Sequence, residues 1–341
     1  MSASVEAWQL AGALLLIVSS AGATAGLIVL LFPLMQRYAL ARPNGRSSHK
    51  VPTPQGGGAA VVAATIVMTV VAAMCGGLSG GAALTPIFLA AALLAVVGAV
   101  DDIRPIAVAP RLMLQALAIG AVIAMLPGEW RLVPFVPWSI EFVLLLLAGM
   151  WFVNLTNFMD GIDWITVAEV VPITAGLVLI GWLGALPPYG IAVALALLGA
   201  MIGFAPFNRP VARLFLGDVG SLPIGLLLGW MLLLLGANGH LAAAVILPLY
   251  YLADATLTLA RRLWAGEKVW HAHRSHFYQR AIKAGFTVPE VVARVFAVNL
   301  VLVGLAILTV LAPHLATLSA ALLAAAGLVG WLLFTFARGP A

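Results

Sequence analysis

The chain contains 341 residues, of which 63% are apolar and only 9% are charged. A soluble domain is closer to half apolar and a quarter charged, so this composition excludes an ordinary soluble domain and indicates a polytopic membrane protein. The net charge is +5, and Cys75 is the only cysteine. A single cysteine excludes an intramolecular disulfide and any zinc cluster built on cysteine ligands.

Long apolar runs follow one another along almost the whole chain. A helix needs about 20 apolar residues to cross about 30 Å of hydrocarbon. The first run begins near Trp8 without a basic flank and continues to Gln36, which favours a span over a cleavable signal peptide. The expected spans are 9–35, 57–75, 83–100, 112–127, 137–156, 165–185, 189–206, 219–236, 241–260, 292–312 and 315–336. We therefore expect an all-α, polytopic integral membrane protein with about eleven transmembrane helices, forming one membrane-embedded domain over residues 1–341.

The charged residues indicate an orientation. An odd number of spans places the termini on opposite sides of the membrane. With the N-terminus outside, all of the 17 lysines and arginines except Arg131 fall on the inner side. Cytoplasmic loops carry such an excess of basic residues. Most acids also lie in inner loops or at the inner ends of spans, so we expect the chemistry on the cytoplasmic side.

The first inner loop reads RPNGRSSHKVPTPQGGGAA. Its glycine run, which begins at Gly56, permits a close approach of the backbone just before the second span. Arg46, His49 and Lys50 could contact an anionic ligand there. The alternative is a basic membrane-proximal loop without a ligand.

Two acidic motifs end the third and fifth spans. The first, GAVDDIR, places Asp101 beside Asp102, and adjacent carboxylates near lipid usually need a cation or a proton. The second, NLTNFMDGIDW, repeats polar residues every three positions, which places Asn157, Asp160 and Asp163 on one face of a helical turn. Hard oxygen ligands without cysteine or histidine nearby favour Mg²⁺ over zinc.

A third acidic motif, FLGDVGS, precedes the eighth span. Asp218 lies between two glycines that expose the backbone, so it could hold a metal ion that bridges phosphates. The alternative is an ordinary turn that caps the following helix.

The longest inner loop contains VWHAHRSHFYQR at positions 269 to 280. Its histidines lack the i, i+4 spacing of a helical zinc pair. Arginine beside histidine is better suited to a diphosphate, which the guanidinium binds by a bidentate fork. Asp254, in the preceding span, is either a functional intramembrane acid or a structural partner for a nearby arginine.

Five of these motifs occur in a fixed order: HKVPTPQGGG, VDDI, NLTNFMDGID, FLGDVGS and HAHRSHFYQR. From about residue 36 to 285, they resemble the polyprenyl-phosphate N-acetylhexosamine-1-phosphate transferases, of the glycosyltransferase family 4 type. That family includes the translocase that makes the first lipid intermediate of peptidoglycan. The catalytic motifs lie within 42–285, and the last motif is most similar to members that start O-antigen-like polysaccharides.

The resemblance implies a reaction and its partners. An N-acetylhexosamine 1-phosphate would pass from a UDP-sugar to undecaprenyl phosphate, with release of UMP. The cofactor would be Mg²⁺, with Mn²⁺ able to substitute. The setting would be the bilayer of a bacterial inner membrane, with a cytoplasmic active site. A homodimer is compatible with this function, and no nucleic-acid partner is expected.

The resemblance also implies roles by position. Asn157 and Asp218 correspond to metal ligands, and Asp101 and Asp102 to the catalytic acidic pair. Asp163 matches the group that reads the uracil ring. The full set of expected substrate-binding residues is His49, Lys50, Asp160, Asp163, His273, Arg274, His276 and Arg280.

Two departures from the family pattern bear on the function. Gln55 occupies a position that is basic in many members, and Trp164 replaces the usual glycine after DGID, where a bulky ring would narrow the substrate pocket. Two rival functions stay open. One is a secondary transporter or lipid flippase that uses intramembrane acids as a relay. The other is an inactive scaffold of a polysaccharide assembly complex, if Gln55 and Trp164 mark an inactive site.

Overall fold

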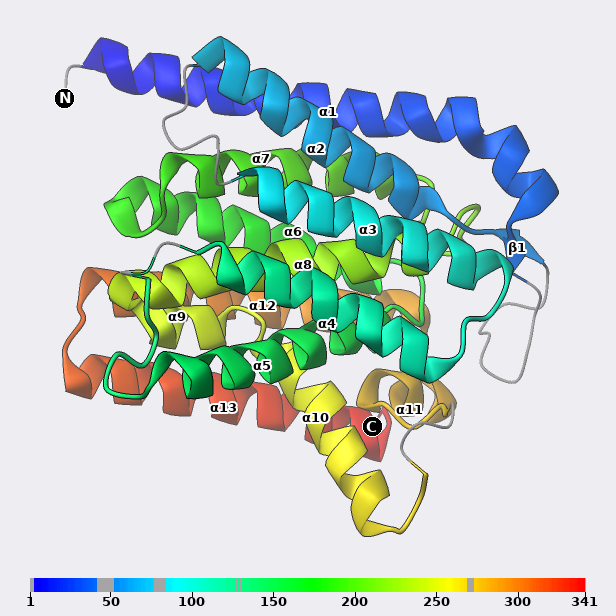
Figure 1. Cartoon of the computed structure of the whole chain (residues 1–341). Coiled ribbons are helices and arrows are strands. Elements are labelled where there is room, and N and C mark those ends of the chain that lie inside the picture. The colour runs from blue at the N-terminus through cyan, green and yellow to red at the C-terminus, as the bar shows by residue number, and fades with distance from the viewer. Residues whose placement is uncertain are drawn as a thin grey trace.

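The computed structural model describes residues 3–41, 52–76, 84–126, 128, 130–268 and 273–340. It confirms the all-α class, because long helices lie side by side in one bundle (Figure 1). The strands in the described residues are β1 (Leu40–Ala41) and β2 (Thr53–Pro54), which form a short antiparallel pair.

The bundle is built from long helices and a few short helical segments, most of them joined by short turns. In chain order they are α1 (Ala3–Tyr38), α2 (Gly57–Gly76), α3 (Leu84–Ile103), α4 (Val108–Ala124), α5 (Trp138–Met159), α6 (Ile165–Ile180), η2 (Gly181–Ala185), α7 (Pro188–Phe204), α8 (Asp218–Leu235), η3 (Gly236–His240), α9 (Leu241–Ile246), α10 (Leu249–Trp264), α11 (Phe277–Lys283), α12 (Val288–Leu311) and α13 (Leu315–Arg338).

Eight helical segments of the described chain are long and apolar enough to cross a membrane, and α4 and α7 are shorter apolar helices. The protein is therefore a multi-pass membrane protein, although this does not establish the expected eleven spans. The predicted ninth span, 241–260, is wrong as one continuous helix. The chain breaks between α9 and α10, where Pro248 lacks the backbone N–H that a continuous helix requires. Beyond the break, α10 leaves the bundle (Figure 1).

The helices differ in how deeply they are buried. The most apolar stretch of the segment from α8 to α9 is 89% buried inside the protein, whereas that of α1 is only 22% buried. Helix α8 is thus the centre of the bundle, and α1 is a peripheral helix that exposes apolar side chains to lipid. The segment that begins at Asp218 is thus enclosed by the other helices along most of its length.

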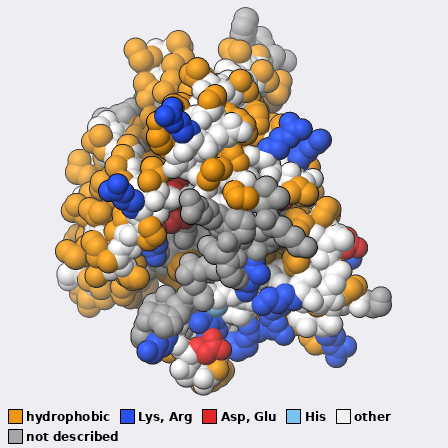
Figure 2. All heavy atoms as spheres, turned by 90° about the vertical axis from the view of Figure 1, so that its right-hand side faces the viewer, with side chains coloured by type: hydrophobic (Ala, Val, Ile, Leu, Met, Phe, Trp, Pro, Cys, Tyr) orange, Lys and Arg blue, Asp and Glu red, His pale blue; other side chains and the backbone are white. Residues whose placement is uncertain are grey.

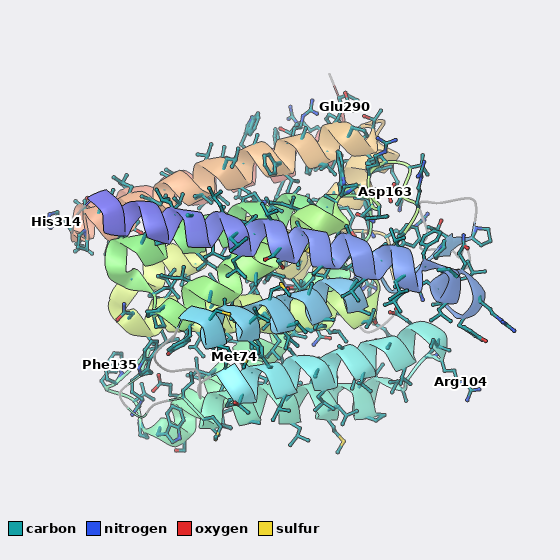
Figure 3. The ribbon with its side chains drawn as sticks, turned by 90° about the horizontal axis from the view of Figure 1, so that it is seen from above. Met74, Arg104, Phe135, Asp163, Glu290 and His314 are labelled. Carbon is teal, nitrogen blue, oxygen red and sulfur yellow. The ribbon has the colours of Figure 1, made fainter. Side chains whose placement is uncertain are left out.

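Charged side chains are concentrated at one end of the bundle. Arg104 and Asp163 lie towards this end, while Phe135 and His314 lie towards the opposite one (Figure 3). Lysine and arginine side chains gather on the face of this end (Figure 2). The described N- and C-terminal segments also lie at opposite ends (Figure 1). Basic side chains and Asp163 thus lie at the same end of the bundle (Figure 2 and Figure 3).

Candidate active site

The end of α3 meets the start of α8 through the Asp102 carboxylate. Its Oδ1 accepts a hydrogen bond from the Asp218 amide (3.0 Å), and its Oδ2 accepts one from the Val219 amide (3.1 Å). These amides begin α8 and have no acceptor within the helix. Close approach requires glycine, because a Cβ at Gly217 would meet Asp102 and a Cβ at Gly98 would meet the Asp218 backbone. Asp102 therefore fixes the position of Asp218.

Asp101 lies beside Arg111, a residue of α4. The Arg111 Nη1 donates to Asp101 Oδ2 at 2.8 Å, and the Ile106 amide donates to the other oxygen at 2.5 Å. The same guanidinium nitrogen is 4.0 Å from Asp218 Oδ2. The Asp101 and Asp218 side chains are themselves within hydrogen-bonding reach of each other. Two carboxylates thus share one arginine, so the cluster has more acidic than basic side chains.

Asn157, in the last turn of α5, completes this acidic cluster. Its Nδ2 donates to Asp218 Oδ1 (2.7 Å) and to Ser221 Oγ (2.9 Å). The two residues expected to bind metal are therefore neighbours, although they are 61 positions apart in sequence. Their carboxylate and amide oxygens are of the type that Mg²⁺ prefers. Among the described residues, however, no three His, Cys, Asp or Glu side chains are already arranged around a metal position.

Asp160 follows α5 directly and lies next to this cluster. It accepts a hydrogen bond from Thr166 Oγ1 at 2.5 Å. Burial raises the pKa of Asp160 to about 6, and the negative charges of Asp102 and Asp163 act in the same direction. The pKa of Asp160 thus lies closer to neutral pH than that of an ordinary aspartate, and an incoming cation would favour its ionised form.

Asp163 and Trp164 anchor the loop that leads into α8. Asp163 is only 6% exposed, and its Oδ2 accepts from the Ala212 amide at 3.0 Å. Trp164 has a left-handed backbone (φ 63°), which explains why glycine suits this position. Its indole donates to the Ala205 carbonyl (2.6 Å), and its amide donates to Asn208 Oδ1 (2.8 Å). The ring is thus fixed against the end of α7.

The first glycine-rich motif packs on the start of α8. Amides of the glycine run donate to carbonyls at positions 215 and 216. A Cβ at Gly58 would collide with Gly220, so the two backbones are in direct contact. Gln55 donates from Nε2 to the Asp102 carbonyl at 2.8 Å. The neutral residue at this position therefore supports the backbone of the acidic pair.

Asp254 organises the basic loop. Its carboxylate accepts from the Phe277 amide (2.9 Å) and the Tyr278 amide (3.1 Å), and lies 3.3 Å from His276 Nδ1. Both Asp254 and His276 are almost fully buried. Its hydrogen-bond partners in the described residues are amides, hydroxyls and a histidine. The structure therefore favours a structural role for Asp254, with different partners from the arginine that the sequence suggests.

Helix α11 connects this loop to the acidic cluster. The Tyr278 hydroxyl donates to the Phe158 carbonyl at 3.1 Å, and only a glycine at position 161 leaves room for that ring. Arg261 and Arg280 both lie over the Phe277 ring, 5.4 and 5.5 Å from its centroid. Two arginines therefore flank Phe277, the residue before the tyrosine that contacts the end of α5.

The remaining expected site residues belong to the same loop or lie outside the described residues. The His273 ring is half-buried and 4.8 Å from the His276 ring. The Arg274 carbonyl accepts from Lys283 Nζ at 2.8 Å. His49, Lys50 and His271 lie outside the described residues.

Comparison with known proteins shows a family resemblance over part of the chain. A model described as glycosyl transferase family 4 matches residues 84–236, which include the whole acidic cluster. The matched region is 153 of the 341 residues, and over it the chain is similar to that family. The basic loop that contains His273 and Arg280 lies outside the region matched by the glycosyl transferase family 4 model.

Individual members of the family align with part of the chain. It is 31% identical to the phospho-N-acetylmuramoyl-pentapeptide-transferase of Leuconostoc citreum (strain KM20) over 175 residues, covering 45% of this chain and 52% of the relative. It is 24% identical to the probable undecaprenyl-phosphate N-acetylglucosaminyl 1-phosphate transferase of Bacillus subtilis (strain 168) over 223 residues, covering 60% of each. The phospho-N-acetylmuramoyl-pentapeptide-transferase of Enterococcus faecalis (strain ATCC 700802 / V583) is 38% identical over 105 residues, covering 28% and 32%. These alignments span between 32% and 60% of each relative's length and confirm the resemblance.

Sequence reasoning missed Arg111 as a cation of this site, and it missed Arg261 beside the basic loop. Arg111 lies ten positions after Asp101, and Arg261 lies in the last turn of α10. Both were counted only as basic residues of inner loops. The short separation between Asp101 and Arg111 could have predicted their contact. A short turn after the acidic pair brings the next helix back beside the end of the preceding one.

Proposed function

We propose that the protein transfers an N-acetylhexosamine 1-phosphate from a UDP-sugar to undecaprenyl phosphate and releases UMP. The observation that carries this proposal is the acidic cluster at the charged end of the bundle, in which Asp101 and Asp218 share Arg111 and Asn157 is bonded to Asp218. The name of the Bacillus subtilis relative supports undecaprenyl phosphate as the acceptor.

The substrates explain why such a cluster needs cations beside it. Two unit charges 4 Å apart repel each other by about 4 kcal/mol at an effective dielectric constant near 20. The acceptor phosphate and the donor diphosphate each carry more than one charge. Arg111 and the arginines of the basic loop, Arg274 and Arg280, supply positive charge for these groups. Catalysis then consists mainly of positioning and charge neutralisation, as in other phosphoryl transfers.

The chemistry of the acidic cluster fits Mg²⁺, and Mn²⁺ offers the same coordination. Asp218 and Asn157 would hold the cation, because their oxygens are hard ligands and Asp218 faces a second carboxylate with one shared arginine. When bound, the ion would neutralise charge on the diphosphate.

The acidic pair divides the remaining work. A phosphate monoester has a second pKa near 6, so the acceptor is largely ionised at neutral pH and attacks the β-phosphorus directly. Asp101 orients the acceptor or removes its remaining proton. Asp102 has both oxygens bonded to α8 amides, so its contribution is to hold Asp218 in place. His273, His276, Asp160 and Asp163 complete the substrate-binding set.

The cellular setting belongs to the same proposal. The basic face at this end of the bundle supports a cytoplasmic active site in a bacterial inner membrane, with the N-terminus outside and the C-terminus inside (Figure 2). The motif HAHRSHFYQR supports the branch that makes the first lipid-linked intermediate of an O-antigen-like polysaccharide.

The direct test is UMP release by membranes that carry the protein. UDP-GlcNAc, UDP-GalNAc, UDP-QuiNAc and UDP-FucNAc are supplied in turn with undecaprenyl phosphate. We expect one or more of them to yield UMP only when Mg²⁺ and the lipid are both present. A transporter, a flippase or an inactive scaffold would release none.

A further inference from the structure

A second buried acid lies within the bundle, away from the acidic cluster. Glu169 is in α6, and its side chain is only 1% exposed. Asn299 of α12 is equally buried, and its Nδ2 donates to Glu169 Oε2 at 2.6 Å and to the Ala168 carbonyl at 3.0 Å. The proposed reaction uses neither residue.

Each member of this pair keeps one oxygen without a partner. Within the described part of the chain, Glu169 Oε1 and Asn299 Oδ1 are buried and receive no hydrogen bond. If Glu169 were ionised, Asn299 Oδ1 would have no donor among the described residues, and besides Asn299 the carboxylate would face only the Tyr251 amide. Buried polar atoms are almost always hydrogen-bonded, so two such atoms on a bonded pair require an explanation. A single proton on Glu169 would supply the missing donor.

The surroundings of Glu169 also oppose a negative charge. No described lysine, arginine or histidine forms an ion pair with it; the titratable groups that face it are Tyr250 and Tyr251. An isolated carboxylate in an apolar interior is strongly disfavoured and normally takes up a proton. Helices α6 and α12 both lie within the membrane-spanning set.

Glu141 provides the contrast within the same protein. It is also 1% exposed, but Arg131 pairs with it, and the amides of Leu132 and Val133 donate to its other oxygen at 2.7 and 3.1 Å. An ionised carboxylate is fully satisfied there. The two buried glutamates therefore differ in the donors that surround them.

The pair lies at the helix break that precedes α10. The backbone amide of Tyr251, in the first turn of α10, faces the Glu169 carboxyl group. The Tyr251 hydroxyl is 3.3 Å from Thr166 Oγ1, which donates to Asp160 Oδ1. Since Thr166 uses its proton on Asp160, the Tyr251 hydroxyl donates to Thr166. One line of contacts thus joins Glu169 to an acid beside the acidic cluster.

We propose that Glu169 is a neutral carboxylic acid paired with the Asn299 carboxamide, and that this pair positions Tyr251 and, through Thr166, Asp160. The acid donates its proton to Asn299 Oδ1 while Asn299 Nδ2 donates to Glu169 Oε2, so all four polar atoms are satisfied. Glu169 is a positioning residue, since its effect on Asp160 passes through other side chains.

Infrared difference spectroscopy of the purified full-length protein tests the neutral acid. The wild-type spectrum minus that of Glu169→Gln should contain the carbonyl stretch of a protonated carboxyl group. Glu141→Gln is the matched control and should remove no such band. Asn299→Ala should shift the band, because the acid loses its partner. An unchanged protonated-acid region in Glu169→Gln contradicts the proposal. Misfolding of Glu169→Gln contradicts it too, since glutamine reproduces the neutral acid's donor and acceptor.

Turnover tests the positioning role, and this arm rests on the proposed function. Glu169→Gln should keep the KM and kcat of the wild type, whereas Glu169→Leu should lower kcat. Equal losses in both variants would mean that a carboxylate is required, which contradicts the proposal. The infrared result needs no turnover, so failure of the proposed transferase activity would leave it interpretable.

Discussion

Asp218 and Asp254 lie at the same end of the bundle but in opposite electrostatic surroundings. Asp254 is surrounded by donors: two amides, His276, and the hydroxyls of Tyr250 and Thr258. Asp218 instead faces other carboxylates and shares Arg111 with Asp101. A saturated acid stabilises the fold, whereas crowded acids with too few cations form a place for a charged ligand. Burial alone does not distinguish the two roles.

The largest expected effect follows from removing the charge of Asp218. We expect Asp218→Asn to reduce turnover by at least about 100-fold, the loss typical of one preorganised electrostatic group. Its unfolding temperature should be unchanged or higher, because a repulsion within the cluster is relieved. Initial rates and thermal unfolding of the same preparation provide the measurement. Near-normal turnover would place the site elsewhere.

Arg111 tests whether the cluster needs its cation. Arg111→Ala removes charge-assisted hydrogen bonds worth about 1.5–3 kcal/mol, which corresponds to roughly a 10- to 100-fold loss of turnover if they act on the reacting phosphates. Arg111→Lys keeps the charge and should lose less. Initial rates are measured over a series of Mg²⁺ concentrations. If Arg111 binds phosphate alone, the Mg²⁺ concentration that gives half of the maximal rate should be the same in both variants as in the wild type.

Substitution of Asp254 should lower stability more than turnover, the reverse of the effect expected for Asp218→Asn. Asp254→Asn weakens hydrogen bonds between a charged acceptor and the amides that begin α11, so we expect unfolding to become easier by about 2 kcal/mol. Turnover at low temperature should fall less than in Asp218→Asn. Thermal unfolding and initial rates, measured beside Asp218→Asn, check this. A variant that loses all turnover but none of its stability would make Asp254 a functional acid.

The smallest expected effect concerns Gln55. Gln55→Ala removes one hydrogen bond to the Asp102 carbonyl, worth about 1 kcal/mol. Turnover should fall by less than about tenfold, with KM for both substrates close to that of the wild type. A large rise in KM for the UDP-sugar would show that Gln55 contacts substrate, as the basic residue of other members suggests.

The sequence predicts the helical class well because it depends on composition along single segments. The break at Pro248 was missed, since the flanking residues are apolar enough to extend a span across it. A polar stripe on α10 that includes Asp254 was the available sign that this helix does not continue through lipid.

The site was only partly predictable for a different reason. Asn157 and Asp218 each lie in a motif with recognisable spacing, so both could be predicted as site residues. Their contact joins distant segments of the chain and could not be predicted. Arg111, Glu169 and Asn299 carry no motif of their own. Their significance depends on which atoms meet across helices, and a single sequence contains no such information.

The central claim is that a sugar 1-phosphate, and not the sugar alone, passes to the lipid. Purified protein is given a UDP-sugar labelled in the β-phosphate, together with undecaprenyl phosphate and Mg²⁺. We predict that the label enters the lipid product in equal amount to the UMP released, and that Asp218→Asn prevents both. Label that remains in UDP while sugar reaches the lipid, or label that appears only as free phosphate or sugar phosphate, would contradict the account.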